Sequence, residues 1–410
     1  MCNRIINTSI IILLCFLKLA FGNNGSTQIK QTYRFKTLPD DGSYTLFMND
    51  ISGNLIISGH EGSGGLITIK RIAFGVKKKD IPKVHKKANI IVTHLEEQNL
   101  INIIGNKKDS LTKFIETTIE LDLPKHINLD FNISGGDISL NMINGKSILR
   151  TLGGDILIQS SKGGINSQTN GGIINIRNSK GTLNMHSFGG GIKVDDYNGT
   201  ISSSTIGGDI LLSNINGDLN CQSSGGSINL KNIQGTKISC RTSGGQIIAE
   251  NLKGEIILKC FGGDTKVTNI IGKSDLYSSG GDITILKSQG SLIINCEKGN
   301  IEVNNMVGSI EAMTSSGNIS ADLDYDSSIK DYSIDIETHS GNIIANIPKN
   351  LPVNIKNIVY QTTSPKAINS EIVLKITIDH DKVIGTRTIA GGTIPFNLKS
   401  HHGSITIKNN

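Results

Sequence analysis

The feature of this sequence that most constrains its fold is a pair of neighbouring glycines that returns every 18 residues. The first glycine of the pair keeps that spacing over nine repeats, apart from a single step of 19: Gly135, Gly153, Gly171, Gly189, Gly207, Gly225, Gly244, Gly262 and Gly280. The register continues at Lys298-Gly299 and Ser316-Gly317. A second glycine stands in the middle of each repeat: Gly145, Gly163, Gly181, Gly199, Gly217, Gly235, Gly254, Gly272, Gly290 and Gly308. A short fixed period of this kind is typical of stacked repeat architectures.

The apolar residues follow the same register as the glycines. Isoleucine stands three positions after the first glycine: Ile138, Ile156, Ile174, Ile192, Ile210, Ile228, Ile247, Ile283, Ile301 and Ile319. A second aliphatic residue follows two positions later, as at Leu140, and that spacing puts both side chains on one face of a β-strand. Another such pair follows the mid-repeat glycine, as at Leu183 and Met185. Each repeat is therefore predicted to hold two short strands, with glycine at the corners because glycine accepts positive φ.

A repeat this short cannot bury its apolar face alone, so the repeats must stack. Stacking in register places successive coils ~4.8 Å apart and lines up the aliphatic positions in buried columns. An asparagine column is also expected, since asparagine tolerates the left-handed conformation and its amide can form ladders along a stack: Asn178, Asn214, Asn232, Asn251, Asn269 and Asn305. The predicted fold is all-β, a single-stranded parallel β-solenoid (β-helix) of about ten 18-residue coils with irregular β caps at both ends.

The regions that flank the repeats lose the period. Residues 29–130 hold strand-like runs without it, and residues 322–400 insert loops before the pattern returns. Both flanks are predicted to be caps, because the open end of a solenoid is a sheet edge that invites aggregation. The predicted organisation is listed by range: a signal peptide over 1–22, an N-terminal β cap region over 23–130, the regular solenoid over 131–321, and C-terminal irregular coils with a cap over 322–410.

The N-terminus has the pattern of a secretory signal peptide. Arg4 supplies the positive charge, Ile10 to Leu17 form a short apolar segment, and Ala20 and Gly22 are the small residues of a cleavage site. The leucine before Cys15 disfavours a lipoprotein signal. The apolar segment is too short to span a membrane, and no transmembrane segment is expected in the mature chain. The protein is therefore predicted to be exported and to be periplasmic, at the cell surface or secreted.

Charge and composition narrow the choice of partner. The formal net charge is +6, and removal of residues 1–22 takes away Arg4 and Lys18 and no acid, which leaves +4. So mild a charge, without aromatic residues interleaved among the lysines, predicts no nucleic-acid partner. Aromatic residues make up only 4% of the chain and tryptophan is absent, so aromatic platforms for stacking sugars are not expected.

One acidic position offers the sharpest candidates for chemistry. Aspartate follows the Gly-Gly pair in five repeats: Asp137, Asp155, Asp209, Asp264 and Asp282. Neighbouring pairs could bind Ca²⁺ or act as the two carboxylates of a retaining glycosidase. The favoured interpretation is that they accept backbone N–H hydrogen bonds at the corner, because other repeats replace them with Gly191, Ser227 or Gln246. No catalytic residue, no metal site and no cofactor is therefore expected.

Four cysteines remain after signal cleavage. Cys260 and Cys296 are two coils apart, beyond the reach of a disulfide, in a column otherwise formed by serine and threonine. Cys221 and Cys240 are within reach in adjacent coils, but parallel neighbours in register are expected to orient poorly for a bond. Stacked small side chains are the favoured interpretation, a Cys221–Cys240 bond stays open, and no cysteine spacing predicts a zinc site.

The strongest cluster of charge is a basic segment in the N-terminal flank. Six lysines fall within eleven residues, just after Lys70 and Arg71: Lys77, Lys78, Lys79, Lys83, Lys86 and Lys87. Pro82 within the segment predicts an exposed loop or a broken helix. A solvated loop is the simplest interpretation. Binding to an anionic surface, such as lipid headgroups, lipopolysaccharide or an acidic polysaccharide, is the alternative, because attraction by charge needs no fixed geometry.

The repeat and both flanks also resemble a known family. Four motifs show the likeness: Ser134-Gly135-Gly136-Asp137-Ile138 with its copies, Leu123-Pro124 before the array, the stretch from Glu337 to Ile343, and the closing stretch from Phe396 to Ile405. Over roughly residues 30–410 the chain resembles the bacterial "putative adhesin" family, a domain-of-unknown-function group of β-strand repeat proteins. The resemblance implies a β-solenoid and, by the family's name, adhesion at the cell surface, and it transfers no catalytic residue. His401-His402 departs from the small residues expected there.

These observations favour a non-enzymatic adhesin or scaffold of the cell envelope or surface. Its extended solenoid face would meet a cell-surface polysaccharide, lipopolysaccharide or another envelope protein. A β-helical polysaccharide lyase or glycosidase is the first alternative. It is disfavoured because no cluster of residues breaks the regularity of the repeats, as a catalytic site usually does, and because no large loop leaves the coils between residues 135 and 320. A periplasmic envelope-stress or signalling component is the second alternative, which the sequence does not separate from adhesion.

Overall fold

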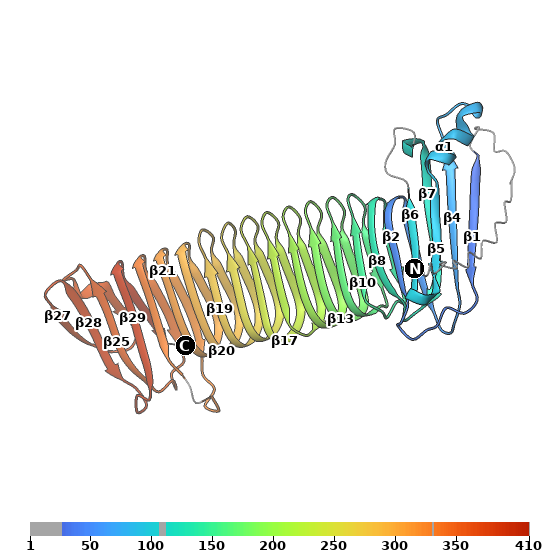
Figure 1. The fold of residues 1–410 in the computed structure, drawn as a ribbon. Helices are drawn as coiled ribbons and strands as arrows, with labels where there is room; N and C mark the ends of the chain where they lie inside the picture. The colour runs from blue at the N-terminus through green and yellow to red at the C-terminus, as the bar shows by residue number, and fades with distance from the viewer. Residues whose placement is uncertain (1–26, 106–111, 330–331, 410) are drawn as a thin grey trace, which may run out of the picture. The chain divides into compact units, whose positions relative to one another are not determined.

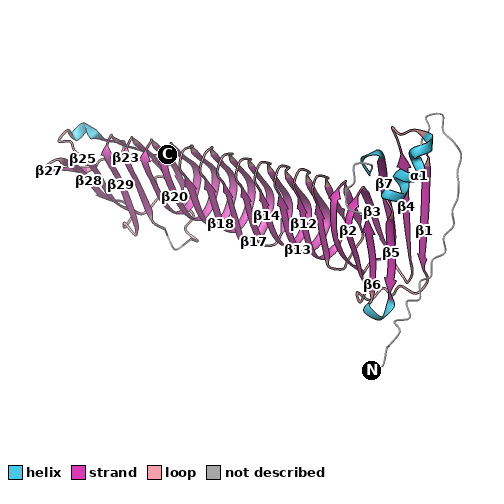
Figure 2. Cartoon of the chain, turned by 45° about the horizontal axis from the view of Figure 1, so that its top comes forward, coloured by secondary structure: helices cyan, strands magenta, loops and turns pink. Residues whose placement is uncertain are grey.

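The protein is all-β, with 68% of the described residues in strands and 5% in helices. The computed structural model describes residues 27–105, 112–329 and 332–409. The predicted signal peptide, residues 1–22, lies outside the described residues. Figure 2 shows helix only as short segments among strands. The described residues form two compact units, which divide between Ser203 and Ser204.

The N-terminal flank of the first unit is a set of mixed strands: β1 (Gln28–Phe35), β2 (Thr45–Ser52), β3 (Asn54–His60), β4 (Gly65–Ala73), β5 (Ile90–Leu95), β6 (Leu100–Gly105) and β7 (Ile115–Pro124). Its helical segments are η1 (Lys78–Asp80), α1 (Ile81–Lys87), η2 (Glu96–Gln98) and η3 (Thr112–Phe114). β4 pairs antiparallel with β1 and β7, whereas β2 and β3 pair in parallel with the first strands of the repeats. The flank is thus an irregular coil extended by antiparallel strands (Figure 1).

The repeats of the first unit supply the remaining strands: β8 (Asn128–Gly135), β9 (Ile138–Asn141), β10 (Ser147–Thr151), β11 (Ile156–Gln159), β12 (Lys162–Thr169), β13 (Ile174–Ser187) and β14 (Ile192–Thr205), the last of which reaches the unit boundary. Neighbouring coils pair in parallel at a shift of one repeat, so that Ile156 lies between Ile138 and Ile174. These three side chains are at most 1% exposed. The predicted isoleucine column is therefore a buried column in this unit.

The repeats of the second unit follow the same pattern in β15 (Ile210–Asn216), β16 (Leu219–Ser223), β17 (Ile228–Thr242), β18 (Ile247–Cys260), β19 (Thr265–Ser278), β20 (Ile283–Lys298), β21 (Ile301–Ser316), β22 (Ile319–Asp324), β23 (Ile334–Ser340) and β24 (Ile343–Ile347). All of these pairings are parallel. The step of 19 residues is absorbed by a register shift between Gln234 and Lys237. The extra residue therefore sits at a corner and leaves the buried columns in line.

The C-terminal part of the second unit contains β25 (Val353–Tyr360), η4 (Pro365–Ala367), β26 (Ile368–Ser370), β27 (Lys375–Asp379), β28 (Lys382–Thr388), β29 (Ile394–His402) and β30 (Ile405–Asn409). β29 and β30 resume the coil pattern, because they pair in parallel with β23 and β24. The segment between β24 and β29 is an insertion, in which β28 pairs antiparallel with both β25 and β27.

Glycine is required at the corners of the coils because of backbone conformation and because of the close approach of the previous coil. The second reason applies at both corners, since a Cβ atom on Gly272 would lie 2.1 Å from the carbonyl oxygen of Gly254. In the middle of the repeat Gly272 has a φ of +128°, which other residues rarely adopt, as predicted. At the Gly-Gly corner the reason is the approach of the previous coil. A Cβ atom on Gly172 would lie 2.1 Å from the carbonyl oxygen of Gly154, and Gly172 has no left-handed φ. The prediction that backbone conformation explains this corner is wrong at Gly172, where close packing of backbones leaves no room for a side chain.

The predicted asparagine column is confirmed. Its six members have positive φ values between 48° and 58°: Asn178, Asn214, Asn232, Asn251, Asn269 and Asn305. In the second unit the amides form a ladder, in which Asn232 donates to Asn214 at 3.0 Å and Asn251 donates to Asn232 at 2.8 Å. The column therefore links successive coils as well as turning the chain.

Candidate binding surfaces

The aspartates at the Gly-Gly corner bind the backbone of the next coil. The backbone N–H of Asp155 donates to the carboxylate of Asp137 at 2.8 Å, and that of Asn300 donates to Asp282 at 2.7 Å. Asn300 in turn accepts from the backbone N–H of Asn318 at 2.9 Å. The interpretation of these side chains as acceptors for backbone N–H groups is confirmed, with the donor one coil further on. Among the residues whose placement is described, no three His, Cys, Asp or Glu side chains gather as a metal site.

The basic segment folds as η1 followed by α1, with Pro82 in the first turn of the helix, where proline is tolerated. This agrees with the broken helix among the two predicted forms. Its six predicted binding residues are all exposed: Lys77, Lys78, Lys79, Lys83, Lys86 and Lys87. Val84 is 1% exposed, so its side chain packs the helix against the rest of the unit. The lysines thus form one basic patch on the first unit.

Arg71 has a different role from these lysines, although the sequence places it just before them. It is only 3% exposed, and its guanidinium donates to the carbonyl oxygens of His85 at 3.1 Å and Ala88 at 2.6 Å, and to the side chain of Gln31 at 2.8 Å. Burial lowers the pKa of Arg71. A cation against the carbonyl end of α1 is favourable, so Arg71 holds the helix in place from within.

A cluster of aromatic and charged side chains lies on the outside of the second unit, and the sequence did not predict it. The guanidinium carbon of Arg241 is 4.5 Å from the ring centroid of Phe261, whose centroid is 5.3 Å from that of Tyr277. The hydroxyl of Tyr277 donates to Glu297 at 2.5 Å. The hydrogen bond between them raises the pKa of Tyr277 and lowers that of Glu297. We call these four residues the aromatic cluster.

The repeat itself positions the aromatic cluster. Register pairs Arg241 with Lys259 and Lys259 with Tyr277, in a column one position before buried Cys260 and Ser278. Phe261 and Glu297 stand one position after that buried column. Alternation along each strand therefore turns all four outward. The expectation that aromatic platforms are absent is wrong here, since adjacent coils bring two isolated rings together.

A second cluster occupies the same outward columns further along the second unit. The ring of Tyr360 stacks on that of His401 at 4.6 Å, and the ring of His339 lies 5.0 Å from His401. Glu337 contacts the Nε2 atom of His401 at 3.0 Å and the Nζ atom of Lys399 at 3.3 Å. Burial acts to raise the pKa of Glu337, but these hydrogen bonds outweigh it and lower the pKa. The sequence signalled this histidine cluster only through His401-His402.

Cys221 and Cys240 form a disulfide between register partners whose Cα atoms are 4.7 Å apart. The expectation that such neighbours orient poorly is wrong, because the spacing of two parallel strands falls within the range of disulfide geometry. Cys260 and Cys296 are free and buried, as expected from their separation. Cys260 donates to the carbonyl oxygens of Gly245 at 3.2 Å and Gly263 at 3.0 Å. It therefore replaces the serine and threonine of its column as a corner donor.

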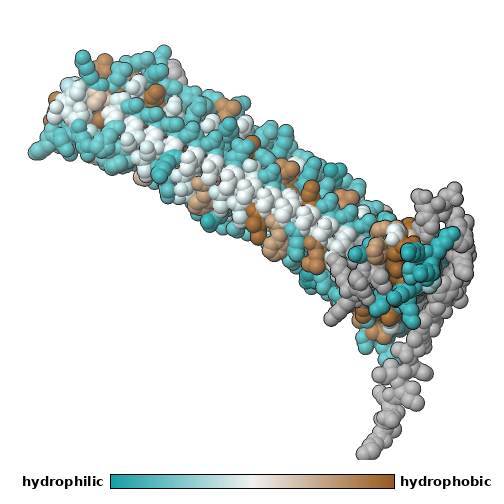
Figure 3. All heavy atoms as spheres, turned by 90° about the horizontal axis from the view of Figure 1, so that it is seen from above, coloured by the Kyte–Doolittle hydropathy of each residue, from teal (hydrophilic) through white to brown (hydrophobic). Residues whose placement is uncertain are grey.

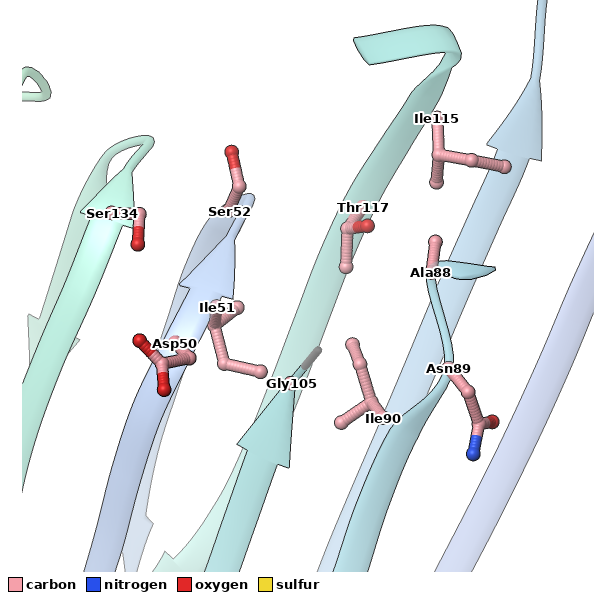
Figure 4. A pocket seen from close by; sticks show the side chains of 10 residues that line it. All are labelled: Asp50, Ile51, Ser52, Ala88, Asn89, Ile90, Gly105, Ile115, Thr117 and Ser134. Carbon is pink, nitrogen blue, oxygen red and sulfur yellow. The ribbon is translucent and has the colours of Figure 1, made fainter. Parts of the chain in front are cut away.

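A small cavity opens in the first unit where β2, β5, β6 and β7 end or begin (Figure 4). Its volume is about 40 Å³, room for a few water molecules at most. Asp50 is the only charged residue among the ten that line it, and Ile51, Ile90 and Ile115 form much of its wall. Ligand sites usually enclose ~300 Å³ or more, so this cavity does not suit a sugar or a cofactor.

The fold and its surfaces define a β-strand repeat protein. Residues 195–383 match the family model described as Toastrack DUF4097, which confirms the predicted resemblance to an adhesin-like β-repeat family. No curated protein matches the sequence. Within the ranges that the structure describes, no helix is long and apolar enough to cross a membrane.

Two solved structures are similar to the chain. One is a "putative cell adhesion protein" from Clostridium sporogenes, 10% identical over 93% of this chain and 100% of that chain, with a TM-score of 0.16. The other is a "putative adhesin" from Bacteroides fragilis, 15% identical over 78% of this chain and 97% of that chain, with a TM-score of 0.21. TM-scores this low support no conclusion about function.

Proposed function

We propose that the protein is an exported, non-enzymatic adhesin or scaffold that binds a polysaccharide of the cell envelope or cell surface. Its coils form a single-stranded parallel β-solenoid of about ten repeats, in keeping with the fixed 18-residue period and with the parallel pairing inside each unit. The observation that supports binding most directly is the aromatic cluster of Arg241, Phe261, Tyr277 and Glu297.

The chemistry of the aromatic cluster suits a sugar. The ring of Tyr277 and the face of Phe261 that Arg241 leaves uncovered can stack on a sugar ring. Arg241 can donate hydrogen bonds to hydroxyl or acidic groups, and Glu297 can accept them from hydroxyl groups. The histidine cluster of Glu337, Lys399 and His401 presents similar chemistry in the same outward columns. A repetitive ligand can meet both, since the solenoid repeats at a constant spacing.

The face drawn in Figure 3 is better suited to a hydrophilic ligand than to an apolar one. In Figure 3, hydrophobic residues stand in small brown groups among hydrophilic and neutral ones on the face shown. Large contiguous apolar patches usually mark protein or membrane interfaces. A polysaccharide, which is recognised by scattered rings and hydrogen-bonding groups, is therefore favoured over an apolar protein partner.

Binding is favoured over catalysis because the strongest catalytic candidates already have another role. The corner carboxylates of Asp137, Asp155 and Asp282 accept hydrogen bonds from the backbone of the next coil. A glycosidase needs one carboxyl group that protonates and a second that attacks or activates water. Neither role fits a carboxylate that accepts a hydrogen bond from the backbone of the next coil.

Export is supported by the pattern of residues 1–22 and by the disulfide between Cys221 and Cys240. Disulfides persist in oxidising compartments such as the periplasm and the cell exterior. The basic patch on α1 is a second candidate surface, which would add attraction to acidic polysaccharide or lipopolysaccharide.

The experiment that tests this function is a glycan array and whole-cell binding with the mature chain, residues 23–410. The double variant Phe261→Ala/Tyr277→Ala should lower the affinity for a bound glycan by about tenfold, a change of ~1.4 kcal/mol. Met313→Ala is the matched control, since Met313 is an exposed residue of the same outward column, 45% accessible. Cleavage of a glycan, or equal binding by the double variant and the control, would contradict the proposal.

A further inference from the structure

β27 is a strand of the second unit with one unused edge. It pairs antiparallel with β28, and in the part of the chain that the structure describes it has no other strand partner. Four of its five residues are exposed, which leaves Asp379 as the only half-buried one. Figure 1 shows β27 beyond β28 at the end of the unit. Its outer edge thus offers backbone N–H and C=O groups that another strand can pair with.

This edge is unusually apolar for an exposed strand. Ile376 is 39% exposed and Ile378 is 49% exposed, and Val373 just before the strand is 79% exposed. Natural proteins normally protect such edges with charges, proline or a bulge, because open edges pair with other chains. Lys375 and Asp379 are the charged residues of β27, and they stand at its two ends.

The five residues of β27 are complementary to themselves. Their sequence, Lys-Ile-Thr-Ile-Asp, begins with a cation and ends with an anion around a central Thr377. When two copies pair antiparallel about Thr377, Lys375 of each copy faces Asp379 of the other, and Ile376 faces Ile378. Opposite charges and branched aliphatic residues directly across an antiparallel pair both stabilise it. We propose that β27 pairs with β27 of a second copy of this chain and forms a two-fold dimer.

The charges within the chain are consistent with this pairing. Asp379 contacts Lys382 at 3.1 Å and His380 at 2.6 Å, on its own hairpin. Among the described residues, no ion pair involves Lys375. In the dimer Lys375 gains the carboxylate of the second copy, and the Asp379 carboxylate gains a further cation. An unrelated peptide strand could form hydrogen bonds with the same backbone groups. It would not place an opposite charge across from both Lys375 and Asp379 in one register.

The dimer is expected to be weak and dependent on concentration. A contact between two five-residue strands is far smaller than the ~1,200–2,000 Å² of a stable interface. Exposed ion pairs add little individually and weaken as salt rises. Such weak self-association is useful to a surface protein, because two linked binding faces hold a repetitive ligand more tightly than one. The dimer itself does not depend on the proposed function.

The first test uses sedimentation equilibrium of the mature chain over a range of concentrations. Lys375→Asp places like charges opposite each other twice in the dimer, so we expect the dissociation constant to rise at least about tenfold. The swap Lys375→Asp/Asp379→Lys restores opposite charges across the pair and should recover most of the association. A wild-type chain that stays monomeric at every concentration overturns the proposal, and so does a Lys375→Asp chain that dimerises as well as wild type.

The second test fixes the register by cross-linking. Thr377 of one copy lies directly opposite Thr377 of the other, so Thr377→Cys should form an intermolecular disulfide under mild oxidation. Thr386→Cys is the matched control, since Thr386 pairs with Lys375 on the inner side of β27. In the dimer it would be separated from its counterpart by about three strand spacings across the sheet and about four residues along it, roughly 20 Å in all. Dimers that form through Thr386→Cys but not through Thr377→Cys would show that another surface associates and would overturn the proposed pairing.

Discussion

The carboxylate of Asp282 accepts a hydrogen bond from the backbone N–H of Asn300, the residue 18 positions later, at 2.7 Å. The same oxygen lies 3.3 Å from the side-chain nitrogen of Asn300. Asp282 is exposed, yet it ties two successive coils together where the Gly-Gly corner brings their backbones close. A residue type that suggested metal binding or catalysis in the sequence therefore acts as a connector of the stack.

We predict that Asp282→Ala destabilises the second unit by about 1 kcal/mol, because the backbone N–H of Asn300 loses its acceptor. Asp282→Asn should change stability little, since the amide oxygen can accept the same bond, as Asn300 does from Asn318. Denaturant unfolding of the three proteins measures the difference. Equal losses in both variants would show that charge, rather than the hydrogen bond, is what this corner requires.

We predict that Ile210→Asp unfolds neighbouring coils of the second unit. Ile210 is fully buried and pairs with Ile228, so the substitution buries an unpaired carboxylate, at a cost of several kcal/mol, roughly 4 or more. The control is Leu211→Asp, because Leu211 is the next residue on the same strand and is 40% exposed. Far-UV circular dichroism and thermal melting should show a large loss for Ile210→Asp and little change for Leu211→Asp.

The buried columns could be predicted from the sequence because the repeat makes a distant contact look local. Ile138 and Ile156 are neighbours in the stack and are also one period apart in the chain, so their pairing needs only the period and the alternation of a strand. The asparagine column is the same kind of feature. The second glycine of each corner was also visible, although its reason, the carbonyl oxygen of the previous coil, needed coordinates.

The binding surfaces were harder to predict, because outward positions vary from coil to coil. Phe261 and Tyr277 look isolated in the sequence, and only the 18-residue register shows that they belong to adjacent coils. Arg71 looks like part of the basic patch, yet it is buried beneath α1, where its donors meet carbonyl oxygens. The insertion between β24 and β29 has no period, so the exposed edge of β27 left no signal.

We predict that the C-terminal coils of the second unit lose stability in acid through Glu337. Contacts with His401 and Lys399 lower the pKa of Glu337 below its usual value of 4.5, against the effect of burial. A depressed folded pKa means that the stabilisation is present above the unfolded pKa and disappears as pH falls through the folded pKa. Asp335, also 3.5 Å from Lys399, and His339 beside His401 are the other titratable groups there.

The measurement is the melting temperature of wild type and Glu337→Gln between neutral pH and about pH 3. Wild type should be the more stable protein near neutral pH, and the difference should shrink to nothing in acid. Glu311→Gln, at an exposed position on the neighbouring β21, is a control whose difference from wild type should not follow this course. A constant difference between wild type and Glu337→Gln at every pH would contradict the role of the ionised carboxylate.

The basic patch gives the last prediction: the mature chain should bind vesicles that contain anionic lipid, or lipopolysaccharide, weakly and only at low salt. Its six lysines are exposed on η1 and α1 and just before them. Their attraction to an anionic surface should fade as salt rises, since exposed charges are screened beyond ~8 Å at physiological ionic strength. Changing all six to glutamine should abolish binding and leave the melting temperature unchanged, because none of these side chains is buried: Lys77, Lys78, Lys79, Lys83, Lys86 and Lys87.

The matched control removes the same number of charges from exposed lysines dispersed over the second unit: Lys237, Lys253, Lys266, Lys273, Lys298 and Lys356. Both variants have the same net charge, so a difference in vesicle co-sedimentation between them reports the clustering of lysines in the basic patch. Arg71→Met is a second variant, which removes the hydrogen bonds to the carbonyl oxygens of His85 and Ala88 and keeps every lysine of the patch. It should destabilise α1 and lower the melting temperature. If the variant without the six lysines of the basic patch binds as well as the dispersed control at low salt, the segment is a solvated surface and the anionic-surface hypothesis is wrong.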